Sequence, residues 1–399
     1  MLGITGHDKA GLTHSLTAIL SAHSARILDI GQAVIHDSLA LGILVELTAE
    51  MESSGLAGQL LEKAEELGVH IRFTEISGAD YDGWVSAQSK RRYLLTLLGT
   101  CISAEHLMVA SGIAARHGLN IDSIDRLSGR TPLENEAGTG RVCIELAVSG
   151  EPGDEEKIRE ELLQMTASYD LDVAFQQDSL YRRTRRLVAF DMDSTLIQGE
   201  VIDELAKLAG VGEQVQAITE AAMRGELDFQ ASFRKRVSLL KGLPASALDE
   251  VILRVPLMDG AERLVTTLRR LGYKTAILSG GFTFFGRTLQ QRLGIDYLHA
   301  NELAIVDGIV TGEVIPPIVD GARKAEMLKM IAEKENLTMD QVIAVGDGAN
   351  DLPMLSMAGL GIAFRAKPVV RRSAKQAISK LGLDGILYLL GVRDRDTLG

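Results

Sequence analysis

Two aspartates, Asp191 and Asp193, close a short apolar run and are followed by the turn-forming residues Ser194 and Thr195. Residues two apart in an extended chain point to the same side, so both carboxylates face one place if the run is a β-strand. A carboxylate pair at the carboxyl end of a strand suits a nucleophile beside a proton carrier, over a hard cation. The alternative is a loop in which Asp193 or Ser194 caps the next helix.

A second apolar run, at 273–278, ends in Ser279, Gly280 and Gly281. A serine hydroxyl and backbone amides that no side chain covers can hold the oxygens of a phosphoryl group. A tight turn without a ligand is the alternative, since glycine favours turns. This segment alone therefore leaves both interpretations open.

A third apolar run, at 341–346, ends in Asp347, and Asn350 and Asp351 follow in the next turn. Lys324 precedes this run, near the start of an expected helix. Taken singly, Asp347 and Asn350 are typical of a helix N-cap, and Lys324 is typical of a solvated helix face.

Together the four segments contain the groups that phosphoryl transfer requires. Asp191 can serve as a carboxylate nucleophile, and Asp191 with Asp347 can offer hard oxygen ligands to Mg²⁺. Asp193 can protonate the leaving alkoxide and later deprotonate water. Lys324 and Ser279 can stabilise charge on the transferring oxygens.

Length and composition indicate a globular protein of two or three domains, with 399 residues, 46% hydrophobic and 24% charged. No uninterrupted apolar segment is long enough to span a bilayer, and the N-terminus lacks a basic region followed by an apolar run. We therefore expect a cytoplasmic protein without membrane contact. The net charge of −12 argues against nucleic-acid partners, so any phosphate site must be positive locally.

Two smaller features also yield expectations. Cys101 and Cys143 each lie in an apolar setting, which predicts reduced, buried thiols and no disulfide. The basic cluster at 182–186 is expected to be a solvated linker that exchanges salt bridges with the acidic body.

The first half of the chain has the pattern of a repeat. Residues 1–80 follow the order strand, helix, strand, strand, helix, strand, which is the ferredoxin-like α+β arrangement. A polar, glycine-bearing linker at 78–91 separates this module from a second copy of the same order at 92–178.

The pattern changes at Leu187, where strands begin to alternate with longer helices. This indicates an α/β domain at 187–399 with a doubly wound, Rossmann-like parallel sheet. A largely helical insertion at about 201–258 follows the Asp191 loop and can cover the strand ends as a cap. Asp307 and Gly308 stand between alternating apolar runs and predict a β-hairpin.

The motifs DMDST, LSGG, a lysine at 324 and GDGANDLPML resemble, in the same order, the four motifs of the haloacid dehalogenase superfamily of aspartate-nucleophile phosphatases. The longer segments DMDSTLIQGEVIDELA and AMRGELDFQASFRKRVSLLKGL are similar to the phosphoserine phosphatases within it. This resemblance implies Mg²⁺-dependent hydrolysis of O-phospho-L-serine to L-serine and phosphate through an aspartyl phosphate. The alternatives are hydrolysis of another small phosphomonoester, phosphoryl transfer to an alcohol, or an inert phosphatase fold that only senses amino acids.

The resemblance also assigns roles to residues. It implies Asp191 as nucleophile, Asp193 as general acid and base, and Lys324 as the motif lysine. It implies a metal site of Asp191, the backbone carbonyl of Asp193, and Asp347, supported by Asn350 and Asp351. The substrate-binding residues implied by the resemblance or by the motifs are Glu200, Met223, Phe229, Arg236, Ser279, Gly280, Gly281 and Asn350.

The N-terminal segments ITGHDKAGLTHSLTAIL and ILDIGQAVIHDSLALGILVEL resemble the ACT domains, a family that commonly binds amino acids between paired copies. The second copy departs from the pattern, because its segment LLGTCISAEHL lacks the Asp-x-x-Gly turn that Asp8 to Gly11 form in the first. We therefore expect a free amino acid as effector, and a homodimer, since two small sheet modules can pair edge to edge within a chain or across a dimer. The resemblance points to Gly11, whose missing side chain allows close approach, as an effector position.

Overall fold

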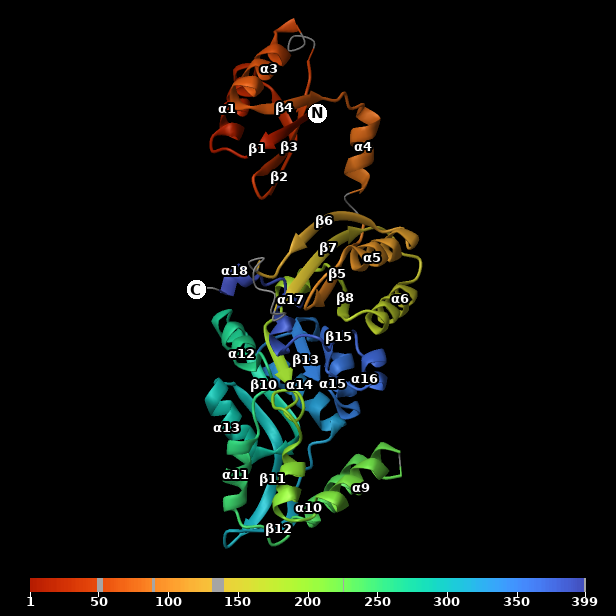
Figure 1. The fold of residues 1–399 in the computed structure, drawn as a ribbon, viewed down its shortest axis with the longest axis vertical. Helices are drawn as coiled ribbons and strands as arrows, with labels where there is room; N and C mark the ends of the chain where they lie inside the picture. Colours follow the sequence, from red (N-terminus) through yellow and green to blue (C-terminus); the bar gives the residue numbers. More distant parts are fainter. Residues whose placement is uncertain (49–52, 88–89, 131–139, 225, 398–399) are drawn as a thin grey trace. The chain divides into compact units, whose positions relative to one another are not determined.

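A computed structural model of the chain describes residues 1–48, 53–87, 90–130, 140–224 and 226–397. The chain divides into two compact units, Met1–Ser89 and Lys90–Gly399 (Figure 1). Within the described residues, no helix has both the length and the apolar character needed to cross a membrane.

The first unit contains the expected ferredoxin-like module. Its four strands form an antiparallel sheet in the order β2-β3-β1-β4, packed against two helices. Leu12, Leu16 and Leu20 recur along one face of the first helix and are buried against the sheet. The elements are β1 (Leu2–His7), α1 (Leu12–Ala22), β2 (Arg26–Ile35), β3 (Ser38–Glu46), α3 (Leu56–Leu67) and β4 (Val69–Phe73).

The segment interpreted from the sequence as a polar linker is in large part a helix, which the sequence interpretation did not predict. Helix α4 covers Gly78–Ala87. Its start is fixed locally, because the Ser77 hydroxyl donates to a carboxylate oxygen of Asp80 at 2.6 Å and accepts from the Asp80 backbone N–H at 3.1 Å. Glycine content concealed this reciprocal cap.

The second unit begins with another ferredoxin-like module of the same topology, with the strand order β6-β7-β5-β8. The repeat inferred from the sequence is therefore confirmed. Its elements are β5 (Arg92–Gly99), α5 (Ala104–Arg116), β6 (Asn120–Arg126), β7 (Val142–Ser149), α6 (Glu155–Ser168) and β8 (Leu171–Gln177).

The two cysteines differ in environment. Both are free thiols, as expected, and Cys143 on β7 is buried, which raises the pKa of its thiol. Cys101 is exposed, so the expectation that both would be buried was wrong. It lies just beyond the end of β5, where the apolar run has already left the sheet.

The rest of the second unit is the doubly wound α/β domain. Its seven strands have the order β12-β11-β10-β9-β13-β14-β15, parallel except for β12, which pairs antiparallel with β11. The strands are β9 (Leu187–Phe190), β10 (Lys274–Phe282), β11 (Tyr297–Val306), β12 (Ile309–Ile315), β13 (Val342–Gly346), β14 (Leu360–Phe364) and β15 (Gln376–Ile378).

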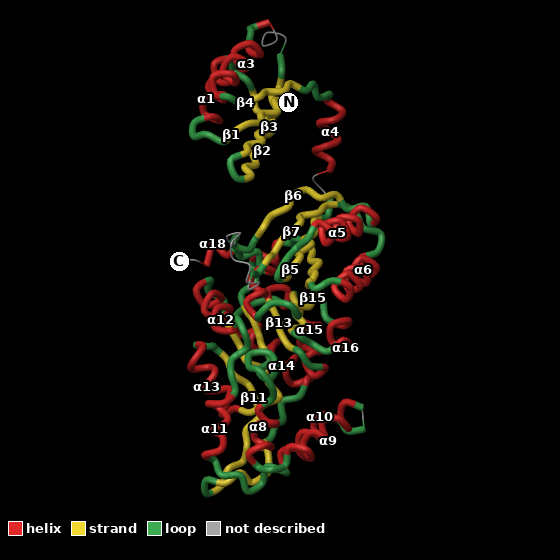
Figure 2. Tube along the Cα trace, in the orientation of Figure 1, coloured by secondary structure: helices red, strands yellow, loops and turns green. Residues whose placement is uncertain are grey.

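Both faces of this sheet are buried, and helices (red in Figure 2) flank the strands. On β9, Val188 and Phe190 belong to one core cluster, whereas Leu187 and Ala189 belong to another. This alternation explains why the strand reads as a continuous apolar run. The flanking and terminal helices are α12 (Ala261–Arg270), α13 (Thr283–Leu293), α14 (Gly321–Lys334), α15 (Leu352–Met357), α16 (Pro368–Ser373), α17 (Ile386–Leu389) and α18 (Asp394–Thr397).

The predicted hairpin and helical insertion are both present. Val306 pairs with Ile309 across the turn, and Asp307 and Gly308 both have positive φ, at 49° and 76°, as a type I′ turn requires. The insertion after β9 contains α8 (Val201–Leu208), α9 (Gly212–Met223), α10 (Phe229–Ser238) and α11 (Ser246–Arg254).

Strand β8 of the second module lies beside β15 at the edge of the seven-stranded sheet. The Gln376 side chain accepts from the Phe175 backbone N–H at 3.0 Å and donates to its carbonyl at 2.6 Å, as a neighbouring strand would. The buried carboxylate of Asp172 accepts the backbone N–H groups of Ser379 and Lys380, each at 2.7 Å. These bonds fix the second module to the α/β domain.

The basic cluster at 182–186 takes part in the same junction. Arg182 is buried and pairs with Glu145 at 2.7 Å, and buried Arg185 donates to Gln176 at 3.4 Å. The expectation of a solvated linker was therefore wrong for these two residues. A basic run in a sequence does not reveal that a partner strand covers it. Helix α7 (Leu180–Arg183) carries Arg182.

Candidate active site

The carboxyl ends of three adjacent strands meet at one edge of the seven-stranded sheet. Phe190 is in register with Ile277 on β10 and with Val345 on β13, so Asp191, Ser279 and Asp347 follow at neighbouring strand ends. The Asp191 backbone N–H donates to the Val345 carbonyl at 2.9 Å, which holds the Asp191 loop against β13. All three residues line one cavity of about 730 Å³.

Lys324 lies beneath this cavity and is completely buried. It is near the start of α14, whose N-cap Asp320 accepts the Arg323 backbone N–H at 2.9 Å. The ammonium group lies 2.8 Å from an oxygen of Asp191 and 2.7 Å from one of Asp351. Burial lowers the pKa of Lys324, but the two carboxylates outweigh burial and raise it overall, so the lysine is charged.

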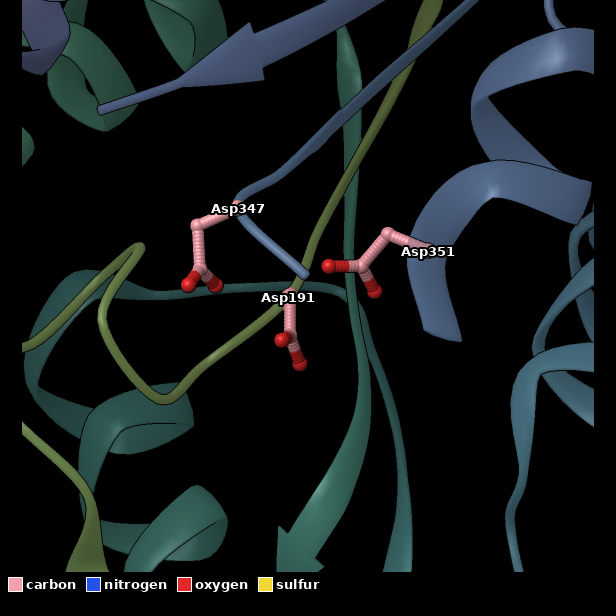
Figure 3. A group of neighbouring side chains, drawn as sticks. All are labelled: Asp191, Asp347 and Asp351. Carbon is pink, nitrogen blue, oxygen red and sulfur yellow. The ribbon is translucent and has the colours of Figure 1, made fainter. Parts of the chain in front are cut away.

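Asp191, Asp347 and Asp351 form a carboxylate cluster with ligand atoms within 4.8 Å of one another (Figure 3). Burial, followed by the charges of Asp191 and Asp351, raises the pKa of Asp347 to about 8. Both oxygens of Asp351 are engaged, one by Lys324 and the other by the Gly348 N–H at 3.0 Å. Asp191 and Asp347 are thus the better placed to bind a divalent cation, and such an ion would relieve their repulsion.

Asp193 occupies a different environment from Asp191. One oxygen accepts the Val201 N–H at 2.9 Å, which ties the Asp193 side chain to the first residue of α8. Burial raises the pKa of Asp193 well above its usual value, and the charges of Glu200 and Asp191 raise it further. A raised pKa favours the protonated form of Asp193, which is the form that a general acid needs. The chain turns sharply immediately after Asp193, where Ser194 has a positive φ of 56°.

The end of β10 places two glycines, Gly280 and Gly281, close to the cap and to the Asp193 side chain. A Cβ atom on Gly281 would lie 2.3 Å from an Asp193 oxygen, and one on Gly280 would lie 2.9 Å from the Phe229 ring. The Gly281 N–H donates to the Ser279 hydroxyl oxygen at 2.9 Å. Only glycine therefore leaves room for the cap and for Asp193 at this strand end.

The helical insertion supplies another wall of the cavity, formed by Glu200, Phe229 and Arg236. Burial and the charge of Asp191 raise the pKa of Glu200, whereas Arg236 opposes the rise. The Nε of Arg236 is buried and has no hydrogen-bond partner among the described residues, so its N–H can donate to a ligand's oxygen.

The structure brings together all but two of the site residues inferred from the sequence. Asn350 also lines the cavity. The Met223 side chain lies outside the described residues, although its backbone ends α9. Gly11 belongs to the first unit, where it precedes α1 with a φ of 87° and open space around the position of a Cβ.

Two cavity residues escaped the sequence interpretation. Lys367 lies just beyond β14 and opens α16, and its charge opposes the raised pKa of Glu200. A basic residue after a strand of a doubly wound sheet is a signal that reveals it. Ser232 is 2% exposed, and its hydroxyl has no partner in the described part of the chain. Its spacing on α10 indicates only helix core.

Comparison with known proteins defines the class. Residues 185–359 match the haloacid dehalogenase-like hydrolases, and residues 1–74 and 92–176 each match an ACT domain. A solved haloacid dehalogenase family hydrolase from Salmonella enterica shares 32% identity with a TM-score of 0.64, and the match covers 74% of this chain and 98% of that one. The fold and the strand-end carboxylates therefore define a haloacid dehalogenase-like hydrolase that carries two ACT domains.

Relatives that match nearly the whole chain identify a narrower family within these hydrolases. The phosphoserine phosphatase SerB2 of Mycobacterium tuberculosis is 41% identical over 98% of this chain and 93% of its own length. The phosphoserine phosphatase of Streptomyces coelicolor is 41% identical over 98% of this chain and 92% of its own length. The solved probable phosphoserine phosphatase of Vibrio cholerae shares 36% identity with a TM-score of 0.59, over 75% of this chain and 86% of that one. This chain belongs to the phosphoserine phosphatase family.

Removing the charge of Asp347 should raise thermal stability when no cation is present and should remove the stabilisation that a cation gives. A raised carboxyl pKa means that the folded state loses stability as pH rises from the ordinary value of 3.8 toward 8. We expect Asp347→Asn to raise the thermal unfolding midpoint by about 2–4 °C at pH 8 in chelator. We also expect it to abolish the further rise that Mg²⁺ gives the unmodified protein. Differential scanning calorimetry measures both.

The matched control is Asp249→Asn, which removes one exposed carboxylate from α11, away from the cavity. It should leave both midpoints within about 1 °C, as surface substitutions usually do. A lower midpoint of Asp347→Asn in chelator, or an undiminished response to Mg²⁺, would contradict the assignment of Asp347 to the cation.

Proposed function

We propose that this phosphoric monoester hydrolase converts O-phospho-L-serine to L-serine and phosphate, with Mg²⁺ as its cation. The observation that carries the proposal is that Asp191, whose carboxylate lies 2.8 Å from the Lys324 ammonium, and Asp193, whose pKa burial raises well above its usual value, lie at one strand end. A hydrolase of this kind needs a nucleophile and a proton donor side by side, and these two carboxyl groups lie in the different environments that such a division of roles requires.

In the first step an Asp191 oxygen attacks phosphorus and the bond from phosphorus to the serine oxygen breaks. Asp193 gives its proton to that oxygen, so L-serine leaves as a neutral alcohol. The product on the protein is an aspartyl phosphate at Asp191. Lys324 and the Ser279 segment stabilise charge on the oxygens during transfer.

In the second step Asp193, now a carboxylate, takes a proton from water, and the water oxygen attacks the phosphorus of the aspartyl phosphate. The bond to Asp191 breaks, which releases phosphate and restores both aspartates. Mg²⁺, held by Asp191, the Asp193 carbonyl and Asp347, would neutralise charge between the nucleophile and the phosphate. The cap helices limit bulk water during the first step and must admit water for the second.

Two charged residues of the cap region favour an amino-acid phosphate over other phosphomonoesters. Glu200 offers a carboxylate to the substrate's ammonium group, and Arg236 offers a guanidinium fork to its carboxylate. Met223 and Phe229 would close over the bound molecule as apolar surfaces. The remaining contacts to the phosphoryl oxygens would come from Ser279, Gly280, Gly281 and Asn350.

The nucleophile is tested by Asp191→Asn. An amide oxygen is a poor nucleophile, so we expect phosphate release from O-phospho-L-serine in Mg²⁺ to fall at least about a thousandfold. Circular dichroism verifies the fold, and quenched-flow labelling with ³²P should detect an acid-stable aspartyl phosphate only in the unmodified protein. Undiminished turnover of the variant would exclude Asp191 as the attacking group.

The carboxylate clamp is tested by Arg236→Ala. We expect kcat/KM for O-phospho-L-serine to fall about 100-fold or more, because a charged hydrogen-bonded pair is lost, whereas p-nitrophenyl phosphate, which has no carboxylate, should change only a few-fold. Arg234→Ala is the matched control, since Arg234 is an exposed residue of the same helix. Equal losses on both substrates would show that Arg236 does not bind the carboxylate.

We propose domain boundaries of 1–80 and 92–178 for the two ACT domains, and of 187–399 for the phosphatase domain, with its cap at 201–258. We also propose that the protein is a homodimer and that a free amino acid regulates it through the ACT domains. Support comes from β2, an edge strand of the first module that exposes apolar side chains. Ile30 and Ile35 are 48% and 70% exposed on this strand. Exposed apolar side chains on an edge strand favour burial against a second copy of the chain.

The effector position is tested by Gly11→Ala. An added methyl group should obstruct an amino acid that approaches this turn, so we expect the concentration of L-serine giving half its effect on turnover to rise at least several-fold. Gly55→Ala is a close control, because Gly55 also precedes a helix of this module with a left-handed φ, 78°, and open space around it. Equal shifts in the two variants would exclude a specific role for Gly11.

A further inference from the structure

A cleft of about 400 Å³ lies between the second ferredoxin-like module and the seven-stranded sheet, within the unit Lys90–Gly399. One side is formed by α6 and β8 of the module, and the other by α16 and the residues that lead into β15. It is separate from the catalytic cavity, and no residue lines both. Its volume is within the range of small-molecule sites.

The charged side chains that line this cleft are mainly basic. They comprise Arg159, Arg371, Arg372 and Lys375, against the single acid Glu160. This is a local reversal in a chain whose net charge is −12. Arg159 keeps capacity for a ligand, since its guanidinium lies 3.9 Å from Glu155 in an exposed and therefore weak pair. By contrast, the Lys375 ammonium already donates to the Ala358 carbonyl at 2.7 Å. Burial lowers the pKa of Lys375, which an incoming anion would oppose.

The floor of the cleft is apolar and firmly held. Leu162 and Phe175 are each 4% exposed, and Val173 and Pro368 also line the cleft. The two hydrogen bonds between the Gln376 side chain and the Phe175 backbone fix this floor across the junction. An apolar floor beneath basic side chains suits a molecule with a hydrophobic body and an anionic end.

We propose that this cleft binds a small carboxylate with an apolar body. The guanidinium groups of Arg371 and Arg372 would hold the carboxylate, since arginine forks match its two oxygens. Another cavity outside the catalytic site, about 710 Å³ in the first module, is lined by Glu46 and Glu75 and by no lysine or arginine among the described residues. A carboxylate therefore favours the cleft over that cavity.

Helix α16 connects the cleft to the catalytic cavity, because its residues border both. Lys367 and Val370 border the catalytic cavity, whereas Pro368 and Arg371 border the cleft. A molecule in the cleft thus touches the same short helix that forms a wall of the catalytic site. This proposal goes beyond hydrolysis itself, and binding can be measured without turnover.

The probe is phenylacetate, with its uncharged isostere phenylacetamide, titrated into the full-length protein and followed by saturation-transfer NMR. We expect phenylacetate to bind with at least about tenfold higher affinity than the amide, because the amide has no charge for the arginines. Arg371→Gln/Arg372→Gln should weaken phenylacetate binding at least about tenfold. Arg269→Gln/Arg270→Gln, a matched pair in the last turn of α12, should leave it within about twofold.

Two further variants secure the location. Arg159→Gln, on the opposite wall and exposed, should also weaken binding and gives a second test if the double variant folds poorly. Arg236→Gln should leave phenylacetate affinity unchanged, which excludes the catalytic cavity as the site. Equal affinity for acid and amide, equal losses in the two double variants, or loss of binding in Arg236→Gln would overturn the proposal.

Discussion

The catalytic site depends on one buried cation, Lys324, held between Asp191 and Asp351. Burying three charges is costly, and each compensates another only while all are in place. Lys324 comes from the start of α14, Asp191 follows β9, and Asp351 ends the turn after β13. The interaction therefore requires the parallel sheet and its helices to be correctly assembled, and it links folding of the α/β domain to formation of the site.

The same cation separates the properties of two aspartates that are nearly adjacent in the chain. The side chain of Asp191 lies 2.8 Å from the Lys324 ammonium, whereas Asp193 lies beside Gly281 and near Glu200, where burial raises its pKa. The sharp turn at Ser194 makes this possible, since it redirects the chain immediately after Asp193. In isolation the two carboxyl groups are chemically equivalent, and only their different surroundings in the fold can assign them different roles.

Much of the fold and of the catalytic site could be predicted from the sequence, because the relevant patterns were local or followed from the order of the strands. Apolar runs that end in polar residues placed Asp191, Ser279 and Asp347 at one sheet edge, and the Asp307-Gly308 turn predicted its hairpin. What could not be predicted depends on partners distant in sequence. Burial of Arg182 requires Glu145 from a strand of the second module. Helix α4 was missed because glycines obscured a cap made by two side chains.

The two ferredoxin-like modules share a topology but differ at the same strand. The last strand of the second module carries Asp172 and Gln176, both buried at the junction with the α/β domain. The last strand of the first module carries His70 and Arg72 at exposed positions, so it presents no comparable seam. Buried polar groups that bond across the junction make the second module a fixed part of the catalytic unit. The two copies of one fold therefore differ in a single strand, in which polar groups that strand must satisfy.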